Sequence, residues 1–230
     1  MERIYRAAKQ AKGVAGELAA LPTPRKNEIL LAMAAALRES TADIVSANER
    51  DLRAGRDKGL SAGLLDRLML DSSRVDAMAR GMESVAALSD PVGQVLSGGT
   101  VRSGLRILKK RVPMGVVGMI YEARPNVTAD AIALCVKTGN AVLLKGGSDA
   151  LHSNMAIARI ATEAAYKAGL PEGAIALIES TDRAAARTLM GLQGYLDVLI
   201  PRGGAGLIRE VVDNAKVPVI EIGRASCRER

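Results

Sequence analysis

Two hydrophobic periods divide the chain into a helical first part and an alternating second part. Over residues 1–90, apolar side chains such as Ile29, Met33 and Leu37 recur every three or four residues, which is the spacing of one helix face. Ala and Leu, both strong helix formers, dominate this stretch. The pattern predicts a layer of amphipathic helices that ends at Asp90-Pro91.

After this helical layer the hydrophobic pattern changes to an alternation with a period of two residues. Side chains alternate on both sides of Ser97-Gly98-Gly99, which predicts an antiparallel hairpin over residues 92–112 with its turn at these three residues. The basic run Lys109-Lys110-Arg111 is then expected on an exposed face of the ribbon. The hairpin is predicted to protrude from the body of the protein.

From Val112 onward, short apolar segments alternate with helical segments, the pattern of a parallel sheet covered on both faces. The expected strands are 116–121, 141–144, 174–178, 196–200 and 217–220, and the expected helices are 126–138, 149–168, 181–190 and 204–214. The predicted fold class is therefore α/β, with N-terminal helices packed on a Rossmann-like parallel sheet and a protruding β-hairpin.

Composition narrows the classes of function. Only two Cys and one His are present, which argues against a multi-cysteine zinc site and makes Ser-His-Asp chemistry hard to build, so we expect no metal. The chain has no Trp or Phe and a formal net charge of +7, a modest excess typical of a solvated surface, so we expect no nucleic-acid partner. The longest apolar run, Ile29–Leu37, is too short to span a membrane, and because the first residues lead into no apolar segment we expect no signal peptide. These features predict a cytoplasmic protein.

Candidate chemistry gathers where the predicted strands end. The segments 122–128, 145–148 and 201–206 each combine a strand end, a polar or Gly-rich turn and a helix start. Ligands of open α/β sheets bind at this edge, and helix N-termini attract phosphate. Any one such turn is as easily a tight connection, but three on one edge favour a nucleotide or another phosphate ligand. None is the G-x-G-x-x-G fingerprint or a Walker A loop.

Several of these segments carry a family resemblance. The stretch 120–128 reads Ile-Tyr-Glu-Ala-Arg-Pro-Asn-Val-Thr, and Lys145-Gly146-Gly147, Thr181-Asp182-Arg183 and Ile200–Gly204 follow it. Together they resemble gamma-glutamyl phosphate reductase, of the aldehyde dehydrogenase superfamily, and the resemblance extends from residue 1 to about residue 221. It implies a cytoplasmic enzyme that reduces L-glutamate 5-phosphate with NADPH to L-glutamate 5-semialdehyde and phosphate in L-proline biosynthesis.

The resemblance also implies binding residues. Lys145 would reach the adenosine ribose, and neutral Ser148 stands where NAD-preferring members often carry Glu. This favours NADP, since a carboxylate there would repel the 2′-phosphate. Arg124 and Asn126 are candidates for holding the acyl phosphate or its developing oxyanion, although Arg124 could equally brace its turn. The implied cofactor-binding residues are Lys145, Gly146, Gly147, Ser148, Pro201, Arg202, Gly203 and Gly204.

The family mechanism needs a nucleophilic cysteine, which lies in a Pro-Ser-x-Cys-Asn segment that this chain lacks. Cys135 falls on an apolar helix face and is predicted to belong to the core. Cys227 is flanked by Arg residues but has no family motif around it. We therefore expect no catalytic residue in this chain, which would bind NADPH without turning over. The alternative is a non-catalytic NADP-binding module or a truncated paralogue.

Four segments are expected. Residues 1–91 form the helical part of the cofactor domain, 92–112 the hairpin that serves as an oligomerisation arm, and 113–221 the NADP-binding Rossmann-like domain. Residues 222–230 match the translation of a common short-read sequencing adapter and are expected to be an artefact, so that the gene is truncated. The full-length protein is expected to form a homo-oligomer.

Overall fold

The computed structural model describes residues 1–122 and 124–221. The adapter-like tail at 222–230, with Cys227, lies outside the described residues. Helices fill the first part of the chain, as predicted: α1 (Glu2–Ala20), α2 (Thr23–Glu39), α3 (Thr41–Asp57), α4 (Ala62–Leu68) and α5 (Ser72–Ala87). The apolar face that predicted α2 is buried, since Ile29, Met33 and Leu37 have no exposed surface.

The second part contains an exposed ribbon and a parallel sheet with helices between its strands. The ribbon consists of β1 (Val95–Thr100) and β2 (Arg106–Lys110). The elements that follow it are β3 (Val116–Tyr121), α6 (Asn126–Lys137), β4 (Ala141–Lys145), the short 3-10 helix η1 (Ser148–Ala150), α7 (Leu151–Lys167), β5 (Ile175–Leu177), α8 (Arg183–Met190), β6 (Val198–Arg202) and α9 (Ala205–Asn214).

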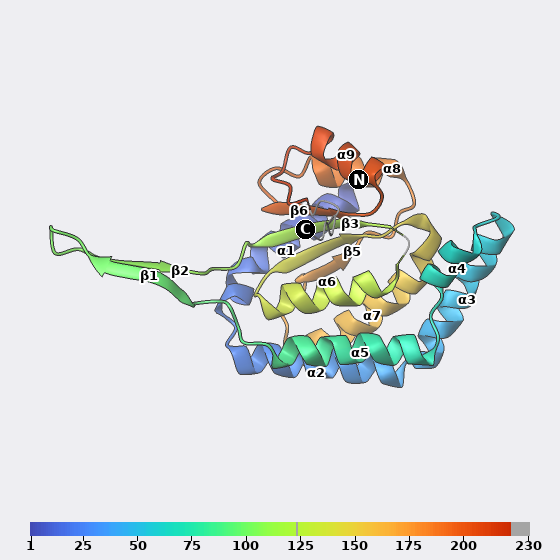
Figure 1. Ribbon diagram of the computed structural model, residues 1–230, viewed down its shortest axis with the longest axis horizontal. Helices are drawn as coiled ribbons and strands as arrows, with labels where there is room; N and C mark the ends of the chain where they lie inside the picture. The colour runs from blue at the N-terminus through green and yellow to red at the C-terminus, as the bar shows by residue number, and fades with distance from the viewer. Residues whose placement is uncertain (123, 222–230) are drawn as a thin grey trace, which may run out of the picture.

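The sheet lies between two helical layers and has the strand order β5-β4-β3-β6, with parallel pairing throughout (Figure 1). Helix α1 contacts one face, α6 and α7 cover the other, and α2, α3 and α5 form an outer layer on α6 and α7. Every residue of β4 is buried, as expected for a central strand covered on both faces. The predicted α/β fold class is confirmed.

One predicted strand is displaced by two residues. The apolar run at 196–200 predicted the fourth strand of the sheet, but β6 begins at Val198. The N–H of Leu196 still donates to the carbonyl of Leu192, and the Asp197 carboxylate accepts from the N–H of Val116 at 2.8 Å. Leu196 and Asp197 therefore belong to the turn that enters the strand. Val219 pairs with Leu199 as an isolated parallel bridge, so the segment predicted as a further strand at 217–220 does lie at this edge of the sheet.

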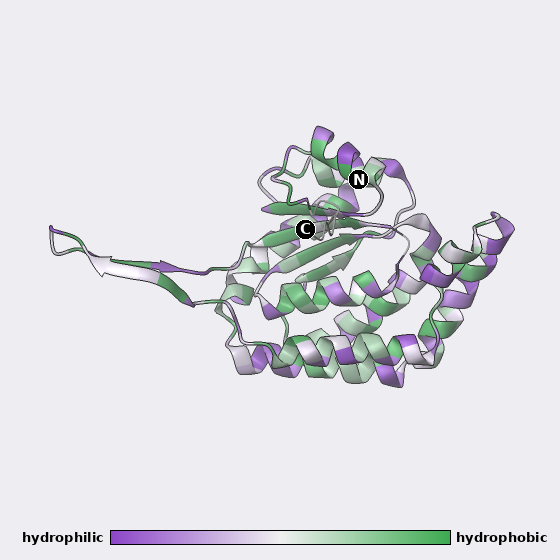
Figure 2. Ribbon diagram, in the orientation of Figure 1, coloured by the Kyte–Doolittle hydropathy of each residue, from purple (hydrophilic) through white to green (hydrophobic). Residues whose placement is uncertain are grey.

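The ribbon forms as predicted, but its turn does not lie at Ser97-Gly98-Gly99. These residues belong to β1, and the chain reverses at Val101–Leu105, where Gly104 has a φ of +85°. Gly98 serves close cross-strand approach instead, because a Cβ there would meet the Leu108 side chain at 2.5 Å. Every residue of both strands is exposed, and the ribbon carries polar and apolar residues out of the body (Figure 2).

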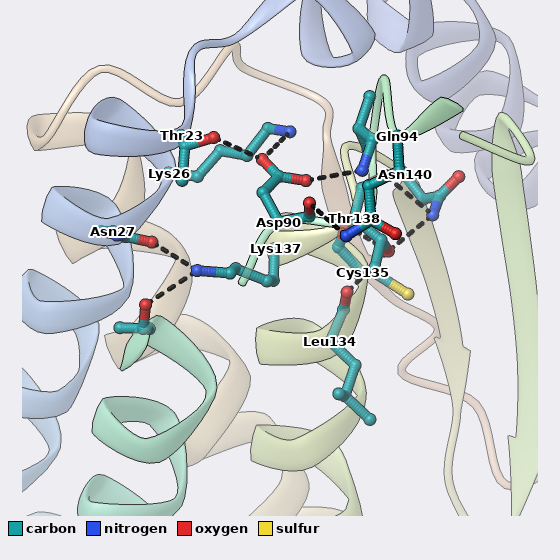
Figure 3. Close-up of polar contacts among 12 residues, drawn as sticks. Thr23, Lys26, Asn27, Asp90, Gln94, Leu134, Cys135, Lys137, Thr138 and Asn140 are labelled. Carbon is teal, nitrogen blue, oxygen red and sulfur yellow. Dashed lines mark hydrogen bonds and ion pairs between the residues drawn. The ribbon is translucent and has the colours of Figure 1, made fainter. Parts of the chain in front are cut away.

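A buried polar cluster anchors the start of the ribbon to the helical layers (Figure 3). Lys26 on α2 is 1% exposed and its ammonium lies 3.0 Å from the Asp90 carboxylate. Lys137 on α6 donates to the side-chain oxygen of Asn27 and to the carbonyl of Ala86, both at 2.7 Å. These contacts join α2, α6 and the chain end of α5, so the ribbon leaves the body from a fixed point.

Candidate functional site

The carboxyl ends of β3, β4 and β6 lie side by side, as predicted for the three Gly-rich or polar segments. The chain passes from β3 to β4 on one side and returns to β6 on the other, so the direction of winding switches between β3 and β6. Such switch points form ligand crevices in α/β proteins. A cavity of about 550 Å3, here called the sheet-edge cavity, opens at this edge, and Tyr121, Glu122, Lys145 and the turn 146–148 are among its lining residues.

Lys145 is the last residue of β4 and is only 7% exposed. Its ammonium donates to the carbonyl of Gly146 at 2.8 Å. Burial lowers the pKa of Lys145 below its usual value, and the Asp182 carboxylate opposes this shift. The side chain is therefore not a solvated surface lysine: it is a largely desolvated cation at the wall of the sheet-edge cavity.

The turn after Lys145 needs glycine for a steric reason. A Cβ on Gly146 would lie 2.2 Å from the side-chain nitrogen of Asn154. Asn154 is held in place because its oxygen accepts from the hydroxyl of Thr128 at 2.9 Å, and Thr128 in turn bonds to the Tyr121 hydroxyl at 2.6 Å. This buried chain of bonds ties β3, α6 and α7 together and fixes the floor of the turn.

Glu122 closes the switch point between β3 and β6. Its carboxylate accepts from the N–H of Gly204, just before α9, at 2.8 Å. A Cβ on Gly203 would lie 2.5 Å from the same carboxylate oxygen, so a larger residue there would displace the Glu122 side chain. An anion thus already occupies the N-terminus of α9, where an electronegative group is favoured. Sequence reasoning gave Glu122 no role beyond its place in the family stretch.

Three further carboxylates, those of Asp149, Asp182 and Glu210, line the sheet-edge cavity; sequence reasoning gave none of them a binding role, and two of them bond to groups of the protein. Asp182 caps α8 by accepting from the N–H of Ala184 at 2.8 Å. Asp149 pairs with Lys58, the residue just after α3, at 3.2 Å. Each of the two is therefore already engaged by a donor of the protein.

The N-terminus of α7 is satisfied from within the protein. The buried Asp51 carboxylate accepts from the N–H groups of His152 and Ser153 at 3.1 and 2.7 Å and from the Ser153 hydroxyl at 2.6 Å. Asn48 donates to the same hydroxyl at 3.0 Å. These amides are not open to a phosphate, which leaves Lys145 as a group at this edge that suits one; the start of α9 suits a phosphate only where the Glu122 carboxylate is displaced.

The remaining implied residues divide between two places. Pro201 and Arg202 lie on β6, where they pair with Ile120 and Tyr121 of β3. Arg124 and Asn126 instead line a second cavity of about 340 Å3, here called the α5–α6 cavity. The structure therefore does not bring the implied substrate residues into the same cavity as Lys145.

The α5–α6 cavity contains a carboxylate that sequence reasoning missed. Asp130 on α6 accepts from the side-chain nitrogen of Asn126 at 3.2 Å. Burial raises the pKa of Asp130, whereas Arg202 and the bond from Asn126 act in the opposite direction. The spacing of four residues between Asn126 and Asp130 was the available signal, since it places both on one helix face.

We also searched the part of the chain that the structure describes for a reactive cysteine, a metal site and a membrane-spanning helix. Cys135 is buried in the core, as predicted, and burial raises the pKa of its thiol to about 12. Within residues 1–122 and 124–221 no group of three or more His, Cys, Asp or Glu side chains is arranged to hold a metal ion. None of the helices in those same ranges is long and apolar enough to cross a membrane.

Comparison with known proteins identifies the family. A family model described as the aldehyde dehydrogenase family matches residues 1–216. The chain belongs to the aldehyde dehydrogenase family. Within this family it is similar to the gamma-glutamyl phosphate reductase of Moorella thermoacetica, at 59% identity over 218 residues that cover 95% of this chain and 52% of the relative. The enzyme of the same name from Clostridium novyi is 54% identical, with 97% of this chain and 54% of the relative covered.

Solved structures of aldehyde dehydrogenase relatives support the same family assignment. The crystal structure of gamma-glutamyl phosphate reductase from Thermotoga maritima matches with a TM-score of 0.93 at 42% identity, covering 96% of this chain and 53% of that chain. A probable aldehyde dehydrogenase from Listeria monocytogenes, at 18% identity and a TM-score of 0.77, shares the fold. The chain spans about half the length of the curated relatives it matches.

Proposed function

We propose that this chain is the cofactor-binding half of a gamma-glutamyl phosphate reductase, which reduces L-glutamate 5-phosphate to L-glutamate 5-semialdehyde and phosphate in L-proline biosynthesis. The observation that carries the proposal is the desolvated cation of Lys145 beside the close-packed Gly146 turn, at the carboxyl edge of a parallel sheet. The names of the relatives, at up to 59% identity, support the same activity.

The groups at the sheet-edge cavity fit a phosphorylated nicotinamide cofactor. Gly146, Gly147 and Ser148 line the cavity with backbone and one small side chain, which lets a ligand approach the backbone closely, whereas the Cβ position of Gly203 faces the Glu122 carboxylate. We propose that Lys145 to Ser148 hold the adenosine end and that Pro201 to Gly204 lie along the pyrophosphate or nicotinamide side. NADPH would supply the hydride for the reduction.

Preference for NADP over NAD is part of the proposal. Lys145 offers a cation for the 2′-phosphate and Ser148 places no charge near it. Asp182 is the opposing influence, because it lies close enough to affect the pKa of Lys145. Its carboxylate is already bonded to the N-terminus of α8, which favours the cation as the determinant.

We also propose that Arg124 and Asn126 hold the acyl phosphate. The complete protein is proposed to form a homo-oligomer through the exposed β1–β2 ribbon and to act in the cytoplasm. The nucleophilic cysteine belongs to the part of the relatives that this chain does not cover. A second candidate function is a non-catalytic NADP-binding module, favoured by one observation: within residues 1–122 and 124–221 the cysteine present, Cys135, is buried and its thiol has a raised pKa.

The source DNA and the reaction together test the proposal. Sequencing across the Val219 codon is expected to reveal a reading frame that continues into a Cys-Asn segment. The protein encoded by that frame should oxidise NADPH in the presence of L-glutamate 5-phosphate, whereas the 230-residue chain should bind NADPH and leave it unoxidised. A complete protein that fails to oxidise NADPH would refute the activity. A source gene that encodes Ile222 to Arg230 and then stops would favour the binding module.

A further inference from the structure

The α5–α6 cavity brings together charged side chains from segments far apart in the sequence. Its lining includes Arg67 from α4, Arg74 from α5, Arg124 before α6 and Asp130 on α6. Arg74 is already engaged, because its guanidinium lies 2.8 Å from the Asp66 carboxylate. It therefore braces the wall of the cavity, and the other three side chains are the ones open to a ligand.

Asp130 is the most informative of these three. Its carboxylate is half-buried and has no Lys or Arg nitrogen within 4 Å among residues 1–122 and 124–221. The neighbouring helix α5 carries Gly81 at this point, where even a Cβ would stay 4.0 Å from the carboxylate oxygen. The amide of Asn126 donates to this carboxylate and the charge of Arg202 acts on it from a greater distance, but no direct ion pair completes its neutralisation, so the site suits a cationic group of a ligand.

The two arginines differ in their position relative to the sheet edge. Arg124 follows Glu122 by two residues, and Glu122 lines the sheet-edge cavity. Arg67 comes from α4 and is exposed at the α5–α6 cavity. A ligand in the α5–α6 cavity would therefore have Arg124 toward its reacting end and Arg67 and Asp130 toward its other end.

We propose that the α5–α6 cavity binds the amino-acid end of the substrate, with Asp130 as the counter-ion of its α-ammonium group and Arg67 as that of its α-carboxylate. This inference rests on the proposed function, which supplies a substrate with one group of each charge. The volume of about 340 Å3 falls at the small end of the range for ligand sites, as suits an amino acid. Specificity follows, because a site with an unpaired carboxylate rejects a ligand that lacks the ammonium group.

The test compares two ligands that differ by the ammonium group, L-glutamate and glutarate. Each is titrated into the ¹⁵N-labelled chain, and binding is followed through the amide signals of residues around Asp130. The variants are Asp130→Asn, which keeps the shape and removes the charge, and Asp213→Asn, which removes the same charge from an exposed position on α9 outside both cavities. Arg67→Gln tests the second contact.

L-Glutamate is expected to bind more tightly than glutarate. Asp130→Asn should weaken L-glutamate binding about tenfold, the size of a lost charged hydrogen bond, and leave glutarate binding unchanged. Arg67→Gln should weaken both ligands, and Asp213→Asn neither. Equal binding of the two ligands, or an equal effect of Asp130→Asn on both, would overturn the subsite, as would a lack of L-glutamate binding.

NADPH binding to the same samples separates this result from the proposed function. If NADPH binds and the two ligands are not distinguished, the subsite is wrong and the cofactor assignment stands. If the ligands are distinguished and NADPH does not bind, the cofactor assignment fails and the subsite stands. Unchanged NADPH binding by Asp130→Asn also shows that this variant is folded.

Discussion

Replacing Lys145 with Gln should reduce NADPH binding much more than NADH binding. Gln retains an N–H donor near the carbonyl of Gly146, to which the ammonium donates at 2.8 Å, but removes the charge. The two cofactors differ by the 2′-phosphate alone. Any loss caused by local rearrangement therefore affects both equally, and the difference between them isolates the interaction of the cation with the phosphate.

The burial of Lys145 sets the expected size of this difference. Two unit charges 4 Å apart interact by about 1 kcal/mol in water and about 4 kcal/mol at the effective dielectric constant of a protein site. Lys145 is 7% exposed, so the upper part of this range applies. We expect a difference of about 2–4 kcal/mol, or roughly 30- to 1000-fold in relative affinity.

Isothermal titration calorimetry of each cofactor into the chain measures this difference. The matched control is Lys167→Gln, which removes a charge from an exposed position at the far end of α7. The control should leave both affinities unchanged. Equal losses for NADPH and NADH in Lys145→Gln would refute the argument that this lysine recognises the 2′-phosphate.

Three further predictions concern other parts of the fold. Glu122→Gln should tighten NADPH binding about two- to fivefold in the same titration, because its oxygen can still accept from the Gly204 N–H but no longer carries the negative charge that opposes a phosphate at the start of α9; weaker binding would contradict this. Asp90→Ala should destabilise the protein by about 3 kcal/mol and lower Tm by roughly 6–12 °C in a thermal melt, since it leaves the Lys26 ammonium buried without its partner; an unchanged Tm would show that the pair contributes nothing. Cys135 should resist iodoacetamide at neutral pH in the folded chain and react after unfolding, as peptide mapping by mass spectrometry can show, because burial raises the pKa of its thiol to about 12; modification of the native chain would contradict the burial.

The contribution of Asp90 to the stability of the folded state also depends on pH. Burial tends to raise the pKa of Asp90, but the hydrogen bonds from the Val92 N–H, Lys26 and Thr23 outweigh it and hold the pKa below its usual value. The folded state therefore favours the ionised form. This contribution is present at neutral pH and is lost as the pH falls through the lowered pKa, so wild type and Asp90→Ala should converge in strong acid.

Local sequence patterns predicted most of the fold because the residues of most helices and strands favour by themselves the structure that the fold gives them. The strand at 116–121 was predicted with the bounds that β3 has, since continuous apolar residues between a glycine and a polar turn favour a buried strand. The hairpin turn was placed wrongly because Gly98 and Gly99 suit a turn by themselves. Only the packing of Leu108 across from Gly98 reveals the other use of glycine.

The site was less predictable, because the residues that contact one another there lie far apart in the sequence. The edge of the sheet could be predicted, because carboxyl ends of parallel strands must meet there. The burial of Lys145 and the contact of Glu122 with Gly204 depend on neighbours that lie far away in the chain. The α5–α6 cavity depends on α4, α5 and α6 together, so Asp130 has no local signal beyond its helical spacing from Asn126.

A crystal structure of the chain with NADP⁺ would show whether Lys145 recognises the cofactor. The 2′-phosphate is expected within about 4 Å of the Lys145 ammonium, in contact range for an ion pair. The pyrophosphate is expected beside Gly203 and Gly204, with the Glu122 carboxylate displaced from the Gly204 N–H. A cofactor bound in the α5–α6 cavity, or with its 2′-phosphate away from Lys145, would refute the assignment of the cofactor site.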